Sequence, residues 1–142
     1  MPSTYSVMDM GHADFGGGPA HAHGAAGTSV ADLTGPATGE PDVDVRLEAR
    51  QESFELASGE RVQGYTLNGS SPGPAIQAHQ GDLVQVTLTN VDVPEGVTLH
   101  WHGVDVPNAE DGVAGVTQDA VRRGEQHVYR FVAEDAGTYW YH

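Results

Sequence analysis

The stretch VDVRLEAR, residues 43–50, decides the fold class of this chain. Its apolar residues Val43, Val45, Leu47 and Ala49 alternate with polar ones, which is the period of a strand with one buried face. Similar short runs follow it: ERVQGYTLNG, AIQAHQ, DLVQVTLTNV, VTLHWHGV, QHVYRFVA and GTYWYH. Turn compositions such as NGSSPGP, HQGD and PNAEDG separate them, and no run keeps a helical period. The sequence therefore predicts an all-β fold, an antiparallel sandwich or barrel.

Residues 1–41 differ in composition from the rest of the chain. They are rich in Gly, Ala, His, Pro and Thr, as in FGGGPAHAHGAAGTS, and contain too few apolar residues to form a core. We therefore expect a disordered arm over 1–41, followed by one domain over 42–142. A solvated tail is the simplest interpretation of the arm, but it also contains soft groups that can hold copper(I), at Met8, Met10, His12, His21 and His23.

The charge and the residue types that are absent exclude several function classes. Twenty acidic residues against six arginines give a formal charge of −14, which argues against a nucleic-acid partner or an anionic membrane. Because the sequence has no cysteine, it has no disulfide, thiolate metal site or thiol nucleophile. Any metal must therefore be bound by His, carboxylate or Met. The sequence has neither an apolar run of membrane-spanning length nor a secretory signal pattern, so we expect no membrane contact in the chain as given.

The stretch TLHWHG, residues 98–103, places two histidines in a predicted strand. Residues two apart on a strand face the same side, so His100 and His102 project together, about 7 Å apart along the strand. His142 is at the end of a second predicted strand, and it can join them only if the two strands are neighbours. Neutral imidazole suits copper, zinc, iron and nickel, so the three are candidate metal ligands of undecided metal. Two unrelated histidines, one exposed and one hydrogen-bonded, also fit this spacing.

The remaining aromatic and histidine residues receive structural interpretations. The large aromatic residues near the two histidine motifs are typical of core and corner packing. They are Trp101, Tyr139, Trp140 and Tyr141. His79 and His127 lie beside polar neighbours and are interpreted as surface residues.

The order of several motifs resembles a known family. HWHG is followed by PNAEDGVAGVTQDAV, RRGEQHVYRF and GTYWYH, and this series is similar to the first cupredoxin domain of the multicopper oxidases, the family of laccases and ascorbate oxidase. NGSSPGPAIQAHQGDLVQVTLTN resembles the early strands of that domain. The resemblance covers about 100 residues, from Val43 to the last residue. It implies a Greek-key, plastocyanin-like β-sandwich and a trinuclear copper cluster that reduces dioxygen to water, supplied with electrons by a separate blue copper.

Position by position, the resemblance implies roles for four residues. His100 corresponds to a ligand of the type 2 copper, whereas His102 and His142 correspond to type 3 ligands. Asp111 matches an acidic position near the cluster that can orient water or relay protons, although Asp before Gly is also a common turn pair. Beyond His142 the family continues to another histidine and a last strand. The resemblance thus implies a C-terminally incomplete domain, whose partners are dioxygen and the remaining cupredoxin domains of the oxidase.

Three functions from different classes fit these observations. The first, which we favour, is the copper-binding N-terminal domain of a laccase-like oxidase, inactive alone and acting outside the cytoplasm as the family implies. The second is a stand-alone copper-binding or copper-carrying module. The third is a β-sandwich interaction domain without a metal. A reading frame that continues past His142 into further β-domains with a His-Cys-His motif would favour the first.

Overall fold

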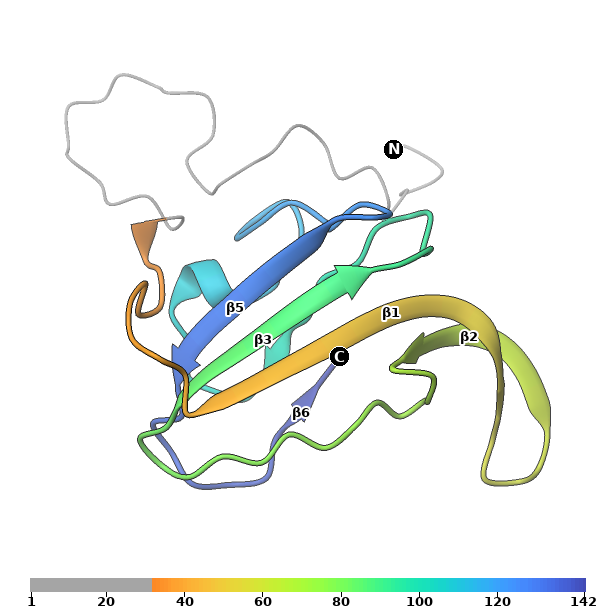
Figure 1. Cartoon of the computed structure of the whole chain (residues 1–142), viewed down its shortest axis with the longest axis horizontal. Coiled ribbons are helices and arrows are strands. Elements are labelled where there is room, and N and C mark those ends of the chain that lie inside the picture. The colour runs from red at the N-terminus through yellow and green to blue at the C-terminus, as the bar shows by residue number, and fades with distance from the viewer. Residues whose placement is uncertain (1–31) are drawn as a thin grey trace, which may run out of the picture.

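The computed structural model describes residues 32–142, which form two β-sheets with very little helix (Figure 1). The larger sheet has the strand order β2-β1-β3-β5, formed by β1 (Val43–Glu55), β2 (Arg61–Leu67), β3 (Leu83–Asn90) and β5 (Gln126–Val132). The smaller sheet pairs β4 (Trp101–His102) with β6 (Trp140–Tyr141), and a 3₁₀ turn, η2 (Asn108–Glu110), lies between β4 and β5 in the chain. No helix within 32–142 is long and apolar enough to cross a membrane.

The larger sheet contains one parallel pair. β1 runs antiparallel to β2 and β3 antiparallel to β5, but β1 and β3 are parallel, with Val43 opposite Val84 and Ala49 opposite Asn90. After β2 the chain crosses through residues 68–82 to the other side of β1 before β3 begins, and such a crossover produces parallel strands. The prediction of an antiparallel sandwich is therefore wrong for this pair.

The alternation predicted over residues 43–50 is confirmed. Leu47 and Ala49 are buried, and Val43 and Val45 pack against the core. Together with the buried face of β3 and residues that pack over it, they enclose one apolar core. Its buried members are Leu47, Ala49, Val84, Val86, Leu88, Val93, Leu99, Trp101, Val121, Tyr129 and Phe131.

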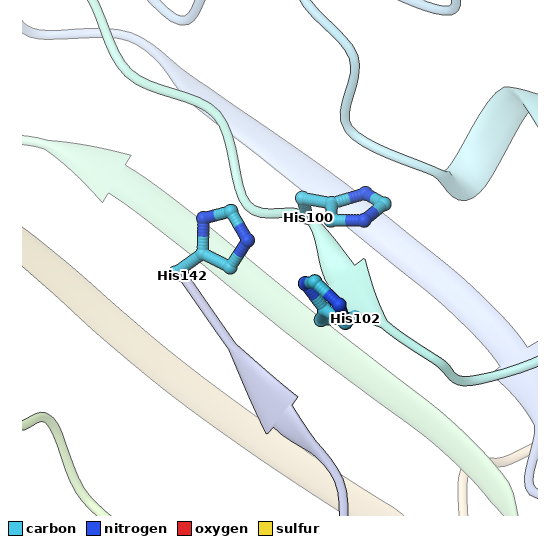
Figure 2. A group of neighbouring side chains, drawn as sticks. All are labelled: His100, His102 and His142. Atoms are coloured by element: carbon cyan, nitrogen blue, oxygen red, sulfur yellow. The ribbon is translucent and has the colours of Figure 1, made fainter.

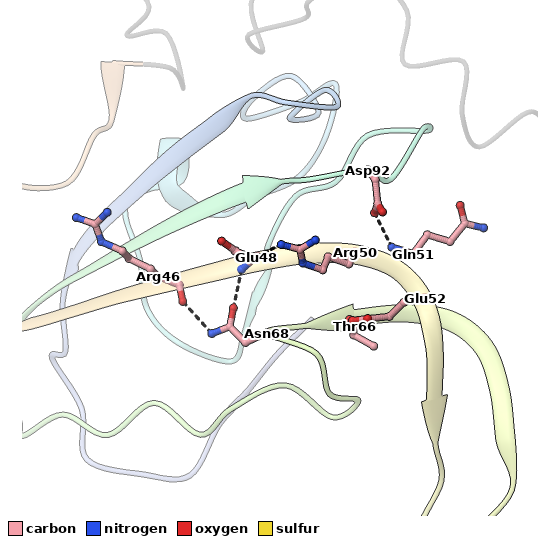
Figure 3. Close-up of polar contacts among 8 residues, drawn as sticks. All are labelled: Arg46, Glu48, Arg50, Gln51, Glu52, Thr66, Asn68 and Asp92. Carbon is pink, nitrogen blue, oxygen red and sulfur yellow. Dashed lines mark hydrogen bonds and ion pairs between the residues drawn. The ribbon is translucent and has the colours of Figure 1, made fainter.

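The opposite face of β1 carries mainly polar side chains (Figure 3). Side chains also form hydrogen bonds with backbone groups at the two edges of β1, where no partner strand lies. β1 pairs with β3 over its first half and with β2 over its second half, so each edge of the strand is partly without a partner strand. Asn68 accepts a hydrogen bond from the Glu48 N–H at 2.7 Å and donates one to the Arg46 carbonyl at 2.9 Å. On the other edge, the Asp92 carboxylate accepts the Gln51 N–H at 2.7 Å. Polar side chains thus pair with three backbone groups along the exposed edges of β1.

Residues 32–41, which composition assigned to the arm, are attached to the domain. The buried carboxylate of Glu110 accepts the Gly35 N–H at 3.1 Å and the Arg130 N–H at 2.9 Å. The Arg130 guanidinium also donates to two backbone carbonyls of this segment, both at 2.8 Å. Backbone groups make these contacts, and composition carries no signal for them. The rest of the predicted arm, residues 1–31, lies outside the described residues.

Candidate metal centre

The pairing of β4 with β6 brings the two histidine motifs together. His100 and His142 exchange two backbone hydrogen bonds, of 2.8 and 3.1 Å, and His102 lies opposite Trp140. The two strands are therefore neighbours, as a site shared by the three histidines requires. Because alternate residues of a strand face opposite sides, Trp101 and Tyr141 point into the core while the histidines face outward.

The three imidazoles face one another on the outer side of this small sheet (Figure 2). Their ring centroids are 5.4 to 5.8 Å apart, and one nitrogen from each ring lies within 4.8 Å of the other two. His100 is half-buried, and His102 and His142 are exposed. The three nitrogens are therefore close enough to one another to serve a common metal centre.

Asp111 fixes the orientation of the His100 ring. The His100 Nδ1 atom lies 2.8 Å from the Asp111 carbonyl oxygen and 3.2 Å from its carboxylate oxygen Oδ1. A carbonyl oxygen can only accept a hydrogen bond, so Nδ1 carries the proton and donates it. The lone pair of Nε2 is then left for a metal ion, which is the usual arrangement of a histidine ligand oriented by a carboxylate.

Gly112 allows the turn that carries Asp111 to approach the histidine strand. Its φ is +71°, in the left-handed region, and a Cβ atom at this position would lie 1.6 Å from the Leu99 carbonyl oxygen. Only glycine fits here, because both the conformation and the close approach exclude a side chain. The sequence analysis weighed a role of Asp111 near the cluster against a common Asp-Gly turn pair, and it gave Gly112 no role of its own. The sequence alone does not say which backbone such a glycine touches.

The core residues beneath the site anchor the strand that carries His100. The Leu99 N–H donates a hydrogen bond of 2.9 Å to the hydroxyl of Tyr129, which is fully buried. Burial raises the pKa of Tyr129 to about 12, so this hydroxyl stays protonated. The Trp101 ring packs against Tyr129 and Phe131, with ring centroids 5.6 and 4.9 Å apart. Leu99 and Trp101, the residues before and after His100, are therefore both held by buried neighbours.

Core packing holds for only two of the four aromatic residues near the histidines. Trp101 is 4% exposed and Tyr141 packs against the core, where its hydroxyl donates to the Pro74 carbonyl at 2.6 Å. Tyr139 and Trp140 are 42% and 58% exposed, so neither is packed in the core. The alternation of β6 explains the difference at Trp140, which shares the outward face with His142.

The two other histidines of the described part differ from each other. The His79 side chain is 97% exposed and lies 3.4 Å from the Asp82 carboxylate, so its surface interpretation is confirmed. His127 is half-buried, with its ring 4.6 Å from that of Tyr129. Burial lowers the pKa of His127, and the nearby charge of Glu110 acts in the opposite direction. Neither residue joins the three-histidine set.

Comparison with known proteins identifies the family. Residues 48–142 match the family model described as multicopper oxidase. The chain belongs to the multicopper oxidase family. Among curated multicopper oxidase relatives, L-ascorbate oxidase of Cucumis sativus is 51% identical over 79 residues, which is 54% of this chain and 13% of that protein. Dihydrogeodin oxidase of Aspergillus terreus is 39% identical over 116 residues, 78% of this chain and 19% of that protein.

Solved structures of multicopper oxidases share the fold. A multicopper oxidase from Pseudomonas thermotolerans superposes with a TM-score of 0.64 at 37% identity, over 70% of this chain and 24% of that one. A laccase from Botrytis aclada gives a TM-score of 0.65 at 36% identity, over 70% of this chain and 19% of that one. The predicted all-β, cupredoxin-like fold is confirmed, and so is copper as the cofactor that membership of this family implies. The chain spans no more than 19% of the two curated relatives above.

Proposed function

We propose that this chain is the part of a laccase-like multicopper oxidase that supplies histidine ligands to the copper cluster reducing dioxygen to water. His100 is the ligand of the type 2 copper, and His102 and His142 are ligands of the type 3 pair. The observation that carries the proposal is the convergence of three imidazoles on one outward face of a chain with this family match. Copper at such a centre supplies the electron transfer that the chain's own residues cannot perform.

The convergence and exposure of the imidazoles support a copper centre shared with another domain. One nitrogen from each ring lies within 4.8 Å of the other two, so all three can serve the same centre. His102 and His142 are exposed, which leaves their nitrogens open to ions held jointly with another domain. The remaining ligands of the cluster are proposed to come from further cupredoxin domains, outside the cytoplasm.

Asp111 is proposed to serve the same centre in two ways. Its carbonyl and carboxylate oxygens hold the proton on Nδ1 of His100, which keeps Nε2 directed to the metal. Its side chain is 33% exposed, so water can reach the carboxylate while one oxygen stays near the imidazole. A carboxylate placed in this way can orient water and pass protons towards the site where dioxygen is reduced.

A stand-alone copper-binding module is the second candidate. It is favoured by the fact that three ligand nitrogens converge within this chain, without a contribution from another molecule. The two candidates differ in what a loaded chain does with dioxygen, and they share the requirement for a copper site at His100, His102 and His142.

Copper titration followed by electron paramagnetic resonance tests the shared site. In every protein compared, His12, His21 and His23 are replaced by Asn, so that the N-terminal histidines do not contribute. We expect the double variant H100A/H102A to bind copper(II) on the order of 100-fold more weakly, because two of the three imidazole nitrogens are lost.

The matched control is H79A. It also removes an imidazole, but from a side chain that is 97% exposed and outside the three-histidine set. We expect H79A to bind like its parent. Equal affinity of the double variant and the parent would contradict the proposed site.

A further inference from the structure

The outward face of the β4–β6 pair is a grid with four corners. His100 lies across from His142, with two backbone hydrogen bonds between them, and His102 lies across from Trp140. On a pair of antiparallel strands these four positions point to the same side. Imidazoles occupy three corners, and the indole of Trp140 occupies the fourth.

The indole ring of Trp140 packs against the rings of two of the three histidines. Its ring centroid lies 4.8 Å from that of His102 and 4.6 Å from that of His142, with interplanar angles of 31° and 34°. Within residues 32–142, these are the aromatic partners of the indole. Trp140 is 58% exposed, whereas Trp101 on the same sheet is 4% exposed. An indole that is this exposed contributes little to the core, and its aromatic contacts within the described residues are with the two imidazoles.

The indole of Trp140 cannot bind a metal ion as the three imidazoles can. The indole nitrogen is a donor only and has no lone pair to give to a metal ion. The fourth corner therefore adds no ligand, and the protein offers three nitrogens from this face. Sites with fewer protein ligands than the metal accepts keep positions open for water or substrate, whereas closed tetrahedral sites are structural.

We propose that Trp140 is a positioning residue of the metal centre. It holds the rings of His102 and His142 by stacking, and it keeps the fourth corner of the grid free of a metal-binding group. This inference rests on the proposed function, because it concerns the same three histidines. It assigns a role to a residue that the sequence analysis interpreted as core or corner packing.

Three substitutions at position 140 separate the two parts of this role, and exposure of the side chain makes each compatible with folding. W140F keeps an aromatic face, W140A removes it, and W140H places a fourth imidazole at the empty corner. The full chain is used, in the background lacking His12, His21 and His23. The probes are copper(II), zinc(II) and cobalt(II) added alone.

The affinity measurements have distinct expected results. We expect W140F to bind copper(II) like its parent, and W140A to bind about two- to tenfold more weakly, as expected for the loss of aromatic stacking. W140H is expected to bind zinc(II) about tenfold or more tightly than its parent, and to give the cobalt(II) absorption of a four-coordinate site. Equal affinities of W140A and W140H to the parent would overturn the proposal.

Nuclear magnetic resonance of the metal-free chain provides a readout that does not depend on binding. The ring-proton shifts of His102 and His142 are expected to change in W140A, because both rings lie against the indole, while those of His79 stay constant. Unchanged shifts would refute the positioning role. If H100A/H102A binds copper(II) as tightly as its parent, the proposed function is wrong. If H100A/H102A binds more weakly but the substitutions at position 140 change neither affinity nor chemical shifts, only the role of Trp140 is wrong.

Discussion

At the scale of single residues, the candidate site depends on groups that are not proposed as metal ligands. Asp111 fixes the tautomer of His100, and the Tyr129 hydroxyl accepts a hydrogen bond from the N–H of Leu99, the residue before His100. His100 and His102 could be named from the sequence because their spacing is local and the strand period is fixed. The contact with Tyr129 could not, because it joins residues 30 positions apart and depends on how the sheets pack.

The pKa of His127 provides a prediction at this scale. Burial lowers this pKa in the folded chain, so the unfolded chain takes up the proton at a higher pH. The folded state therefore loses stability as pH falls below about 6.5. H127Q removes the titrating group, and we expect its urea midpoint to fall less than that of the parent between about pH 7.5 and pH 5.

The exposed His79 serves as the control for that measurement. H79Q removes a histidine whose side chain is 97% exposed, so its pH profile is expected to follow the parent far more closely than that of H127Q. Parallel profiles for H127Q and the parent would show that burial of His127 does not couple to folding.

At the scale of elements, the histidine face depends on two short strands and one turn. The alternation of residues predicted both strands. The three histidines could meet only if these strands were neighbours, and β4 and β6 do pair. The sequence also predicted a strand over AIQAHQ, residues 75–80, which has no assigned strand. Pro72 and Pro74 lie just before it, and because proline has no N–H to donate, pairing is weakened there. Local pattern thus gives the strand-like segments, and the pairing partners decide which of them join a sheet.

The turn after η2 carries a prediction of its own. G112A places a Cβ atom 1.6 Å from the Leu99 carbonyl oxygen, so the turn must move away from the strand and carry Asp111 away from His100. We expect a loss of about 2 to 4 kcal/mol in the free energy of unfolding, since a left-handed conformation alone costs about 1 to 2 kcal/mol and the steric overlap adds to it. Copper(II) affinity is expected to fall roughly tenfold, as for loss of an orienting group.

Gly59 offers a matched control for G112A. Its φ of +84° lies in the same region, but nothing lies within 4 Å of the position of its Cβ. G59A is therefore expected to cost about 1 to 2 kcal/mol of stability and to leave copper binding unchanged. If G112A and G59A lose the same stability and both retain affinity, the approach to Leu99 has no role in the site.

At the scale of the whole molecule, the described residues place the three proposed copper ligands together on one outward face. The family model matches residues 48–142, and three histidines of that range converge. The net charge of −14 favours the approach of cations to the exposed face on which they lie. The sequence has no cysteine, so the chain has no thiolate for a blue copper.

The last prediction is that the copper-loaded chain alone does not couple four-electron dioxygen reduction to the oxidation of a phenol or a metal ion. Three imidazoles cannot hold three coppers, and without a thiolate there is no centre through which electrons enter. A single bound copper can still cycle with ascorbate and release peroxide. Oxygen consumption must therefore be measured together with peroxide, and we expect every oxygen consumed by the chain alone to appear as peroxide.

A chimera supplies the positive arm of this experiment. In it, the chain replaces the matching segment of the Pseudomonas thermotolerans multicopper oxidase, which is 37% identical over the aligned part. Oxidase activity with water as the product is expected in the chimera, and its loss is expected when H100A/H102A is introduced there. H79A in the chimera is expected to leave turnover unchanged, because this histidine lies outside the three-histidine set. Water formation by the 142-residue chain alone would contradict the ligand argument, because it requires a complete copper cluster from three histidines.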